Sequence, residues 1–406
     1  MARFLISPAA LERNARILRQ VGDAGGARML VALKAFACTA ALETVRPYAD
    51  GYCASGLYEA RLAQNLGGEV AVFSPAYREE ELRELLDFAA HIDFNSVPQW
   101  LRFRETCLAH PRAKSGAVLF GLRINPCHST GHTPLYDPCV PGSRLGIPPQ
   151  ELEKAGADAL RGISGLHIHT LCEQGAQELV DTFRAFEKSC AHLLQGGTLR
   201  YLNLGGGHWI TKPFYDRPAL IALLQEIRTK YGVQVYLEPG EAWAIHTGVL
   251  RARVLDVFES LGYRHAILDV SASAHMPDVL EMPYRPDVFA VHAGQGSAGG
   301  PQPAVCLPGE TYSAAADAGA KPHTYRLSAP TCLAGDVIGD FSFDAPLQAG
   351  DELVLDDMAH YTMVKTTHFN GVPHPDIILL HANGTQECVR RFGYADYANR
   401  LGCPPP

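Results

Sequence analysis

Short apolar runs alternate with charged, helix-like segments through the first 240 residues of the chain. Eight runs occupy residues 29–34, 51–54, 70–74, 91–94, 117–124, 162–169, 199–204 and 233–238. Amphipathic stretches such as residues 58–66 and 79–90 lie between them. Strands that alternate with helices form parallel sheets with helical crossovers. Eight such units predict a (β/α)8 barrel of the TIM type.

The pattern changes after about residue 244. Residues 249–257, 265–270, 324–327 and 352–355 read as strands without regular helices between them. This predicts a second, mostly β domain of the sandwich or barrel type. A chain of 406 residues has the length of two domains. We expect residues 12–245 to form the barrel, and residues 1–11 with 246–406 to form the β domain.

The amino-acid composition argues against some classes of binding partner. The chain has 35 Lys and Arg against 43 Asp and Glu, a formal net charge of −8. An acidic chain is a poor match for nucleic acid or for an anionic membrane, and no apolar run is long enough to span a bilayer. Eleven cysteines include no CxxC pair, which favours reduced thiols in a cytoplasmic protein.

In a (β/α)8 barrel the chemistry lies at the carboxyl ends of the strands. Lys34 ends the first run, in MLVALKAFA. Desolvation there would lower the pKa of the lysine and make its amine a nucleophile for a Schiff base. The alternative is a lysine at a strand end that reaches solvent.

Three further runs end in polar or glycine residues. His167 and His169 are two residues apart, so both face one side of a strand. They could bind a metal, or one could stack on an aromatic ligand; hydrogen-bonded core histidines are the alternative. Gly205, Gly206 and Gly207 could cradle a phosphate with successive N–H groups, or form a tight turn. Glu238 needs a partner if buried, either a protonated ring nitrogen of a cofactor or an arginine such as Arg123.

Together these features resemble the pyridoxal-phosphate decarboxylases built on the alanine-racemase-type barrel. Lys34 in ALKAF matches their Schiff-base lysine, His169 in GLHIHTL the histidine that stacks on the cofactor ring, and Glu238 in EPGE the acid on the pyridine nitrogen. The resemblance implies the remaining cofactor contacts: the phosphate-binding glycines Gly205, Gly206 and Gly207, Gly240 of the EPGE string, and Tyr361 in AHYTMVK. It also implies that Cys332 in APTCLAGD is the cysteine contributed by a partner subunit, and hence a homodimer with shared sites.

The match is closest to the branch of carboxynorspermidine (carboxyspermidine) decarboxylases. The strings GLRINP, SRLGI, YLNLGGGHWIT, AHMPDVLEMPYRP and DDMAHYTMVKTTHFNG carry it over nearly the whole chain. The resemblance implies pyridoxal 5'-phosphate as cofactor, polyamine biosynthesis as the role, and no metal. It implies a substrate with an amino-acid head and a cationic polyamine tail. Acids suited to that tail are Glu241, Asp278, Glu281 and Asp336, with His275 shaping the pocket.

The resemblance also implies roles in the reaction. Glu238 would keep the pyridine nitrogen protonated, which favours decarboxylation over racemisation. Cys332 would donate the proton to the α-carbon or guard the face that is protonated. The chain departs from the wider family at Tyr52, Cys172 and Leu333, where ornithine decarboxylases have Asp, Ser and Asp. These departures bear on the substrate-tail contacts and not on the cofactor.

Several alternatives remain open on the sequence. A diaminopimelate- or ornithine-type decarboxylase would share the cofactor site, but a diaminopimelate tail calls for an arginine where the AHMPDVLEMPY segment offers acids. Glu238 disfavours a racemase. A metal-dependent barrel hydrolase could use His167 and His169, although such pairs usually lie on the first strand. The non-catalytic alternatives are a decarboxylase-like regulator and a carrier of pyridoxal phosphate.

Overall fold

The computed structural model of the chain describes residues 1–131, 133–282, 284–293 and 300–403. The chain divides into two compact units. We call residues 13–35 with 45–243 the barrel unit, and residues 1–12, 36–44 and 244–406 the β unit. The grouping differs from the predicted bounds mainly at residues 36–44, which belong to the β unit although they follow the first barrel strand.

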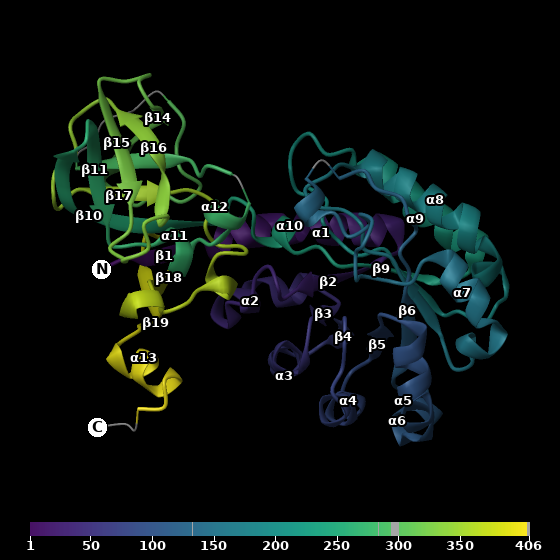
Figure 1. Cartoon of the computed structure of the whole chain (residues 1–406). Helices are drawn as coiled ribbons and strands as arrows, with labels where there is room; N and C mark the ends of the chain where they lie inside the picture. Colours follow the sequence, from purple (N-terminus) through teal and green to yellow (C-terminus); the bar gives the residue numbers. More distant parts are fainter. Residues whose placement is uncertain (132, 283, 294–299, 404–406) are drawn as a thin grey trace. The chain divides into compact units, whose positions relative to one another are not determined.

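The barrel unit contains eight parallel strands in a closed ring, with neighbours in chain order (Figure 1). They are β2 (Arg28–Ala32), β3 (Gly51–Ala54), β4 (Glu69–Ser74), β5 (His91–Phe94), β6 (Leu119–Arg123), β7 (Gly165–His167), β8 (Tyr201–Asn203) and β9 (Gln234–Leu237). Pairing of β2 with β9 closes the ring. Each of the eight predicted runs overlaps one of these strands, so the barrel prediction is confirmed.

Helices connect the barrel strands. The helices of this half of the chain are α1 (Pro8–Gly25), α2 (Thr39–Val45), α3 (Leu57–Leu66), α4 (Glu79–Leu86), α5 (Val97–Ala109), α6 (Pro111–Lys114), α7 (Pro149–Ala155), α8 (Ala176–Gln195), α9 (Arg217–Tyr231) and α10 (Glu241–Ala244). Local residues set their ends: the Asp216 side chain accepts from Ala219 N at 3.0 Å to start α9, and Gly232 ends it at φ +67°.

The β unit is built on a mixed sheet of eleven strands. Eight form a path in the order β13-β12-β17-β10-β11-β15-β16-β14, and β1, β18 and β19 extend it from β10. The strands are β1 (Arg3–Ile6), β10 (Gly248–Ser260), β11 (Tyr263–Leu268), β12 (Val288–Ala293), β13 (Glu310–Ala314), β14 (Ala316–Asp317), β15 (His323–Ser328), β16 (Val337–Phe343), β17 (Glu352–Leu355), β18 (Asp376–Leu380) and β19 (Gln386–Arg390). The four predicted strands coincide with β10, β11, β15 and β17, so the prediction of a mostly β second domain is confirmed.

Three short helices complete the β unit: α11 (Ala272–His275), α12 (Asp278–Glu281) and α13 (Tyr394–Arg400). Two apolar clusters form its interior, one around Leu250, Leu268 and Leu327 and one around Val249, Phe289 and Val354. Among the described residues, no helix combines the length and apolar character that a membrane crossing requires.

Candidate active site

Residues at the carboxyl ends of four barrel strands come together. Lys34 lies in a turn two residues after β2, and His169, Gly205 and Glu238 follow β7, β8 and β9. The Lys34 charge lowers the pKa of both Glu238 and His169, which places all three within electrostatic reach of one another. The Lys34 side chain itself is exposed, in contrast to the desolvated pocket that its apolar strand predicts.

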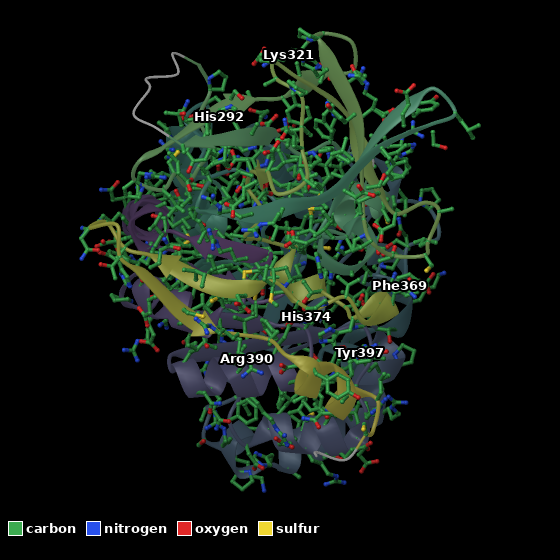
Figure 2. The ribbon with its side chains drawn as sticks, turned by 90° about the vertical axis from the view of Figure 1, so that its left-hand side faces the viewer. His292, Lys321, Phe369, His374, Arg390 and Tyr397 are labelled. Carbon is green, nitrogen blue, oxygen red and sulfur yellow. The ribbon has the colours of Figure 1, made fainter. Side chains whose placement is uncertain are left out.

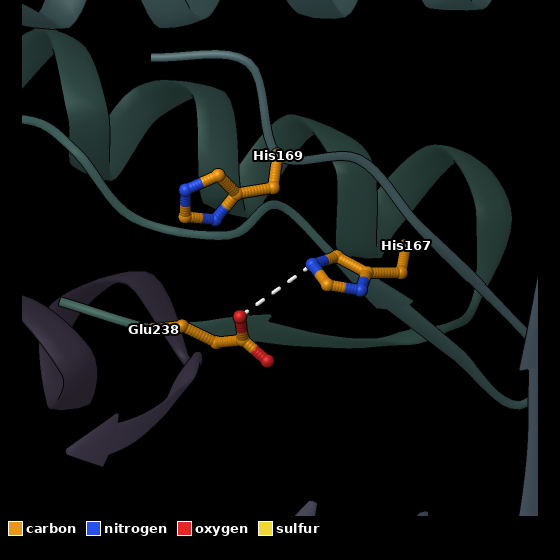
Figure 3. Close-up of side chains that lie close together, drawn as sticks. All are labelled: His167, His169 and Glu238. Atoms are coloured by element: carbon orange, nitrogen blue, oxygen red, sulfur yellow. Dashed lines mark ion pairs between the residues drawn. The ribbon is translucent and has the colours of Figure 1, made fainter. Parts of the chain in front are cut away.

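Glu238 is a buried carboxylate with two neighbours from adjacent strands. Asn203 Nδ2 donates to Oε1 at 2.6 Å, and His167 Nε2 lies 3.5 Å from Oε2 (Figure 3). Burial alone would raise the pKa of Glu238, but the charge of His167 and the hydrogen bonds lower it to about 2. Glu238 is therefore an anion at neutral pH. Its partners are His167 and Asn203, and not the arginine considered from the sequence.

His167 lies between two carboxylates. Its Nδ1 is 3.2 Å from Asp93 Oδ2, and its side chain is 2% exposed. Burial disfavours the charged ring, but the nearby Glu238 and Asp93 carboxylates raise the pKa of His167 overall. Tyr201 Oη donates to the other Asp93 oxygen at 2.5 Å. The polar line Tyr201–Asp93–His167–Glu238 thus crosses the barrel interior.

His169 lies two residues beyond β7 and differs from His167. Their rings are 6.2 Å apart and nearly perpendicular. Gly206 N donates to Nδ1 of His169 at 3.2 Å, and Arg123 donates to the His169 carbonyl at 2.9 Å. Burial, together with the charges of Lys34 and Arg123, lowers the pKa of His169. The ring is therefore neutral and fixed in orientation, as a ring that stacks on an aromatic ligand must be.

Close chain contacts explain the glycines after β8. A Cβ on Gly206 would lie 2.1 Å from the Glu238 carbonyl oxygen, and one on Gly207 would lie 2.0 Å from the Leu171 carbonyl oxygen. Gly240 has the same constraint, since a Cβ there would lie 2.6 Å from Ala35 Cβ. The N–H groups of Gly205 and Gly206 already donate to Asn203 and His169. The glycines therefore position the polar side chains around Glu238.

The remaining predicted site residues lie at the start of α10 and in the β unit. Glu241 begins α10 and is partly exposed. Cys332 has an exposed side chain, and its N–H donates to Asn370 Oδ1 at 2.8 Å. Tyr361 has a backbone φ of +54° and precedes the short helix Met363–Lys365. These positions leave the thiol of Cys332 accessible.

Asp336 and His275 are buried within the β unit. The Asp336 carboxylate accepts from Ser271 Oγ at 2.6 Å, Ser273 N at 3.1 Å, Ser273 Oγ at 3.0 Å and Thr331 Oγ1 at 2.5 Å. Asp336 is only 2% exposed, and its hydrogen bonds connect the start of α11 to the loop after β15. Nδ1 of His275 accepts from Ser271 N at 3.2 Å.

His275 belongs to a cluster of three histidines. Its ring lies 6.5 Å from His374, which stacks on His368 at 3.6 Å; Tyr397 lies against His368 at 5.8 Å (His374 and Tyr397 are labelled in Figure 2). Burial, with a contribution from His374, lowers the pKa of His275 to about 4.

Asp278 and Glu281 lie on α12 and share one cation. Lys365 Nζ contacts an Asp278 carboxylate oxygen and lies 3.1 Å from Glu281 Oε2. The Asp278 side chain is mostly buried and the Glu281 side chain is exposed. Two of the four acids expected to meet a cationic tail thus already face a lysine of the same unit.

The sequence reasoning missed Asp93, Tyr201 and Asn203. Tyr201 and Asn203 are two residues apart on one short strand, so both face the same side of β8. Asp93 lies in the apolar run HIDF. A polar residue at the inward position of a predicted barrel strand was the available signal.

One potential cation cluster lies among the described residues. His167, His169 and Glu238 each offer one atom, and these atoms lie within 4.8 Å of one another. The same side chains already have partners: Gly206 N donates to His169 Nδ1, and Asn203 donates to Glu238.

Comparison with known proteins shows the family. No family model matches the chain. The chain is 42% identical to a carboxyaminopropylagmatine decarboxylase from Synechocystis sp., covering 98% of this chain and 95% of that one. It is 38% identical to a carboxynorspermidine/carboxyspermidine decarboxylase from Campylobacter jejuni, covering 98% and 97%. The chain belongs to the carboxynorspermidine/carboxyspermidine decarboxylase family. The predicted resemblance and the prediction of a decarboxylase are confirmed.

Solved structures agree with this family. Carboxynorspermidine decarboxylase from C. jejuni, complexed with norspermidine, superposes with a TM-score of 0.82 at 37% identity, covering 98% of this chain and 99% of that one. Diaminopimelate decarboxylase from Helicobacter pylori, complexed with L-lysine, has a TM-score of 0.78 at 15% identity, covering 99% and 96%. The second likeness shows the fold alone.

Proposed function

We propose that this family member decarboxylates carboxynorspermidine, carboxyspermidine or both, with pyridoxal 5'-phosphate as cofactor, in polyamine biosynthesis. The observation that carries the proposal is Glu238, a buried carboxylate held ionised by His167 and Asn203 at the carboxyl ends of the barrel strands. An anion in this position complements a protonated pyridine nitrogen.

The other side chains at this end of the barrel fit the same cofactor. Pyridoxal phosphate supplies an electron sink for the electron pair that remains when the α-carboxylate leaves. The neutral His169 ring offers a flat face of fixed orientation, and the exposed Lys34 offers an amine. We assign the remaining cofactor contacts to Gly205, Gly206, Gly207, Gly240 and Tyr361, as the sequence resemblance implies, since a glycine without a side chain leaves its backbone open to a ligand.

Cys332 is the proposed proton donor to the α-carbon. Its thiol is exposed and its backbone N–H is held by Asn370. The Asp336 carboxylate accepts a hydrogen bond from Thr331, next to Cys332 in the chain. We therefore propose that Asp336 stabilises this loop and does not contact the substrate. In the proposed homodimer Cys332 serves the site of the partner subunit.

The proposed substrate tail is cationic. Asp278, Glu281 and Glu241 are the candidate acids, and His275 lies in the same AHMPDVLEM string. A second candidate substrate is carboxyaminopropylagmatine, favoured by the 42% identity to the Synechocystis enzyme. Its tail ends in a guanidinium, which a carboxylate pair recognises as well as an amine. Both candidates share the amino-acid head that loses carbon dioxide.

A spectrum and a trapping experiment test the cofactor. The purified chain should show a visible band with pyridoxal phosphate that borohydride removes, and mass mapping should place the reduced adduct on Lys34. Lys34→Ala should lose the adduct, whereas Lys188→Ala, on helix α8, should keep it. Failure to bind pyridoxal phosphate at Lys34 would overturn the proposal.

Carbon dioxide release should then be compared for carboxynorspermidine, carboxyspermidine, carboxyaminopropylagmatine and diaminopimelate. The proposal expects one of the first two to give the highest kcat/KM. The highest value for carboxyaminopropylagmatine would select the second candidate. Turnover of diaminopimelate alone would contradict both.

Mixing two inactive variants tests the shared site. Lys34→Ala and Cys332→Ala damage different sites if Cys332 acts across the dimer. The mixture should then recover part of the activity, because one site of each mixed dimer is intact. Absence of recovery in a mixture that exchanges subunits would contradict the sharing.

A further inference from the structure

His167 lies between two carboxylates, and its contacts bear on whether its ring is neutral or charged. Nδ1 of His167 faces Asp93 and Nε2 faces Glu238, at 3.2 and 3.5 Å. An ionised carboxylate only accepts hydrogen bonds, and a neutral imidazole has one N–H and one lone pair. A neutral His167 would therefore direct a lone pair at a carboxylate.

We propose that His167 is held as an imidazolium between Asp93 and Glu238, and that Asp93 and His167 are positioning residues that keep Glu238 anionic and correctly oriented. The proposal rests on the proposed function for its consequence in catalysis. The charges would then alternate along the line: Asp93 negative, His167 positive and Glu238 negative. With the extra proton held on His167, Glu238 would remain free to accept a hydrogen bond from a bound cofactor.

The barrel interior is built around this line. A Cβ on Gly121 would lie 2.1 Å from Asp93 Oδ1 and 2.3 Å from the Tyr201 hydroxyl, and a Cβ on Gly165 would lie 2.0 Å from the Tyr201 ring. Glycines at two strand positions thus leave room for the Tyr201–Asp93 pair. Burial and the Asp93 charge raise the pKa of Tyr201, so its hydroxyl remains a donor to Asp93.

The other charged groups around His167 do not remove its proton. Arg123 is the register neighbour of His167 on β6, but its guanidinium donates to the His169 carbonyl and lies over the Phe73 ring at 4.5 Å. The positive charge of Lys34 lowers the pKa of Glu238, and it adds to the effect of burial in lowering the pKa of His169. Burial raises the pKa of the Cys53 thiol, with the Glu238 charge adding to it, so Cys53 is neutral. The two carboxylates are the charged groups in direct contact with the His167 ring.

His91 provides an internal contrast. It is also buried in the barrel, and its ring stacks on Tyr201 at 4.4 Å. Burial lowers its pKa to about 4, despite the nearby Asp93. Direct contact with two carboxylates therefore distinguishes a charged histidine from a neutral one within one barrel.

The experiment is ¹⁵N spectroscopy of histidine side chains in the full chain, with and without pyridoxal phosphate. At pH 7 the signals lost in His167→Gln should show both ring nitrogens protonated, while His91 shows one. In Asp93→Asn the amide can donate to Nδ1, so His167 should become neutral. Tyr201→Phe keeps the Asp93 charge and should leave His167 protonated.

Kinetics of the same variants test the positioning role. Asp93→Asn should lower kcat about tenfold, the effect of a one-unit change in an effective pKa, with KM within about twofold and an altered pH profile. A neutral His167 in the unmodified chain, or an unchanged kcat in a variant whose His167 is neutral, would overturn the inference. The spectra do not need turnover, so a chain with a charged His167 that released no carbon dioxide would contradict only the proposed function.

Discussion

The two units bury titratable side chains in opposite ways. In the barrel unit His167 directly contacts two carboxylates, so charges are buried as neighbours of opposite sign. In the β unit Asp336 is surrounded by hydroxyl and N–H donors, and His275 lies near other histidines and stays neutral. Burial penalises an isolated charge in both units. The partner therefore decides whether a buried group acts as a charge or as a support.

Among the substitutions that test this comparison, the one at Glu238 should have the largest effect. Glu238→Gln keeps the shape and the bond with Asn203 but removes the anion. We expect kcat to fall by about 10²–10³-fold, as for the loss of one electrostatic contact to the reacting system. Carbon dioxide release measures it, with cofactor absorbance to show that the site still binds pyridoxal phosphate. Glu69→Gln, at the amino end of β4, is the matched control, and an equal loss in both variants would contradict the special role of Glu238.

A substitution of Asp336 is expected to lower the stability of the fold and not to act directly on the reaction. Asp336→Ala leaves four donor groups of the β unit without their acceptor. We expect the free energy of unfolding to fall by about 3 kcal/mol, measured by urea denaturation. Asp344→Ala, which removes an exposed carboxylate that pairs with Lys321 in the same unit, should cost less than about 1 kcal/mol. A loss for Asp336→Ala as small as that for Asp344→Ala would show that the four bonds contribute little.

The strand alternation and the strand-end residues could be predicted because they depend on local sequence. All eight barrel strands and the four predicted β-unit strands were found this way. The partners of Glu238 could not, since they come from β7 and β8 and depend on the barrel register, which pairs His167 with Asn203. The burial of Asp336 was also beyond local reasoning, because Ser271 lies 65 residues away in the chain. Periodicity shows which way a side chain faces, but not which side chain it meets.

The neutral histidine of the β unit should appear in the pH dependence of stability. The pKa of His275 is about 4 in the folded chain, below the ordinary value of about 6.5. Between these values the unfolded chain binds more protons, so the free energy of unfolding falls as the pH is lowered. The contribution is at most about 1.4 kcal/mol per pH unit. His275→Asn should flatten the slope between pH 6.5 and pH 4 in thermal unfolding. An unchanged slope would show that His275 titrates normally.

The smallest effect is expected at the ion pairs of Lys365 in the β unit. Lys365 faces the mostly buried Asp278 and the exposed Glu281 on α12. Because Lys365 and Glu281 remain in contact with solvent, these ion pairs should contribute no more than about 1 kcal/mol to stability. If these acids receive the substrate tail, Lys365 competes with it. Lys365→Met should then lower KM for a cationic substrate by about threefold, since a gain below 1 kcal/mol is less than tenfold in affinity, and leave kcat unchanged.

Two comparisons make that result specific. Lys321→Met, which breaks an ion pair with Asp344 elsewhere in the β unit, should leave KM unchanged. The gain for Lys365→Met should shrink as salt is added, because salt screens exposed charges. A KM that rises in Lys365→Met would mean that the lysine holds the acids in place for the substrate. In that case the ion pairs of Lys365 would resemble the contact between His167 and Glu238 in the barrel unit, where a cation orients a carboxylate.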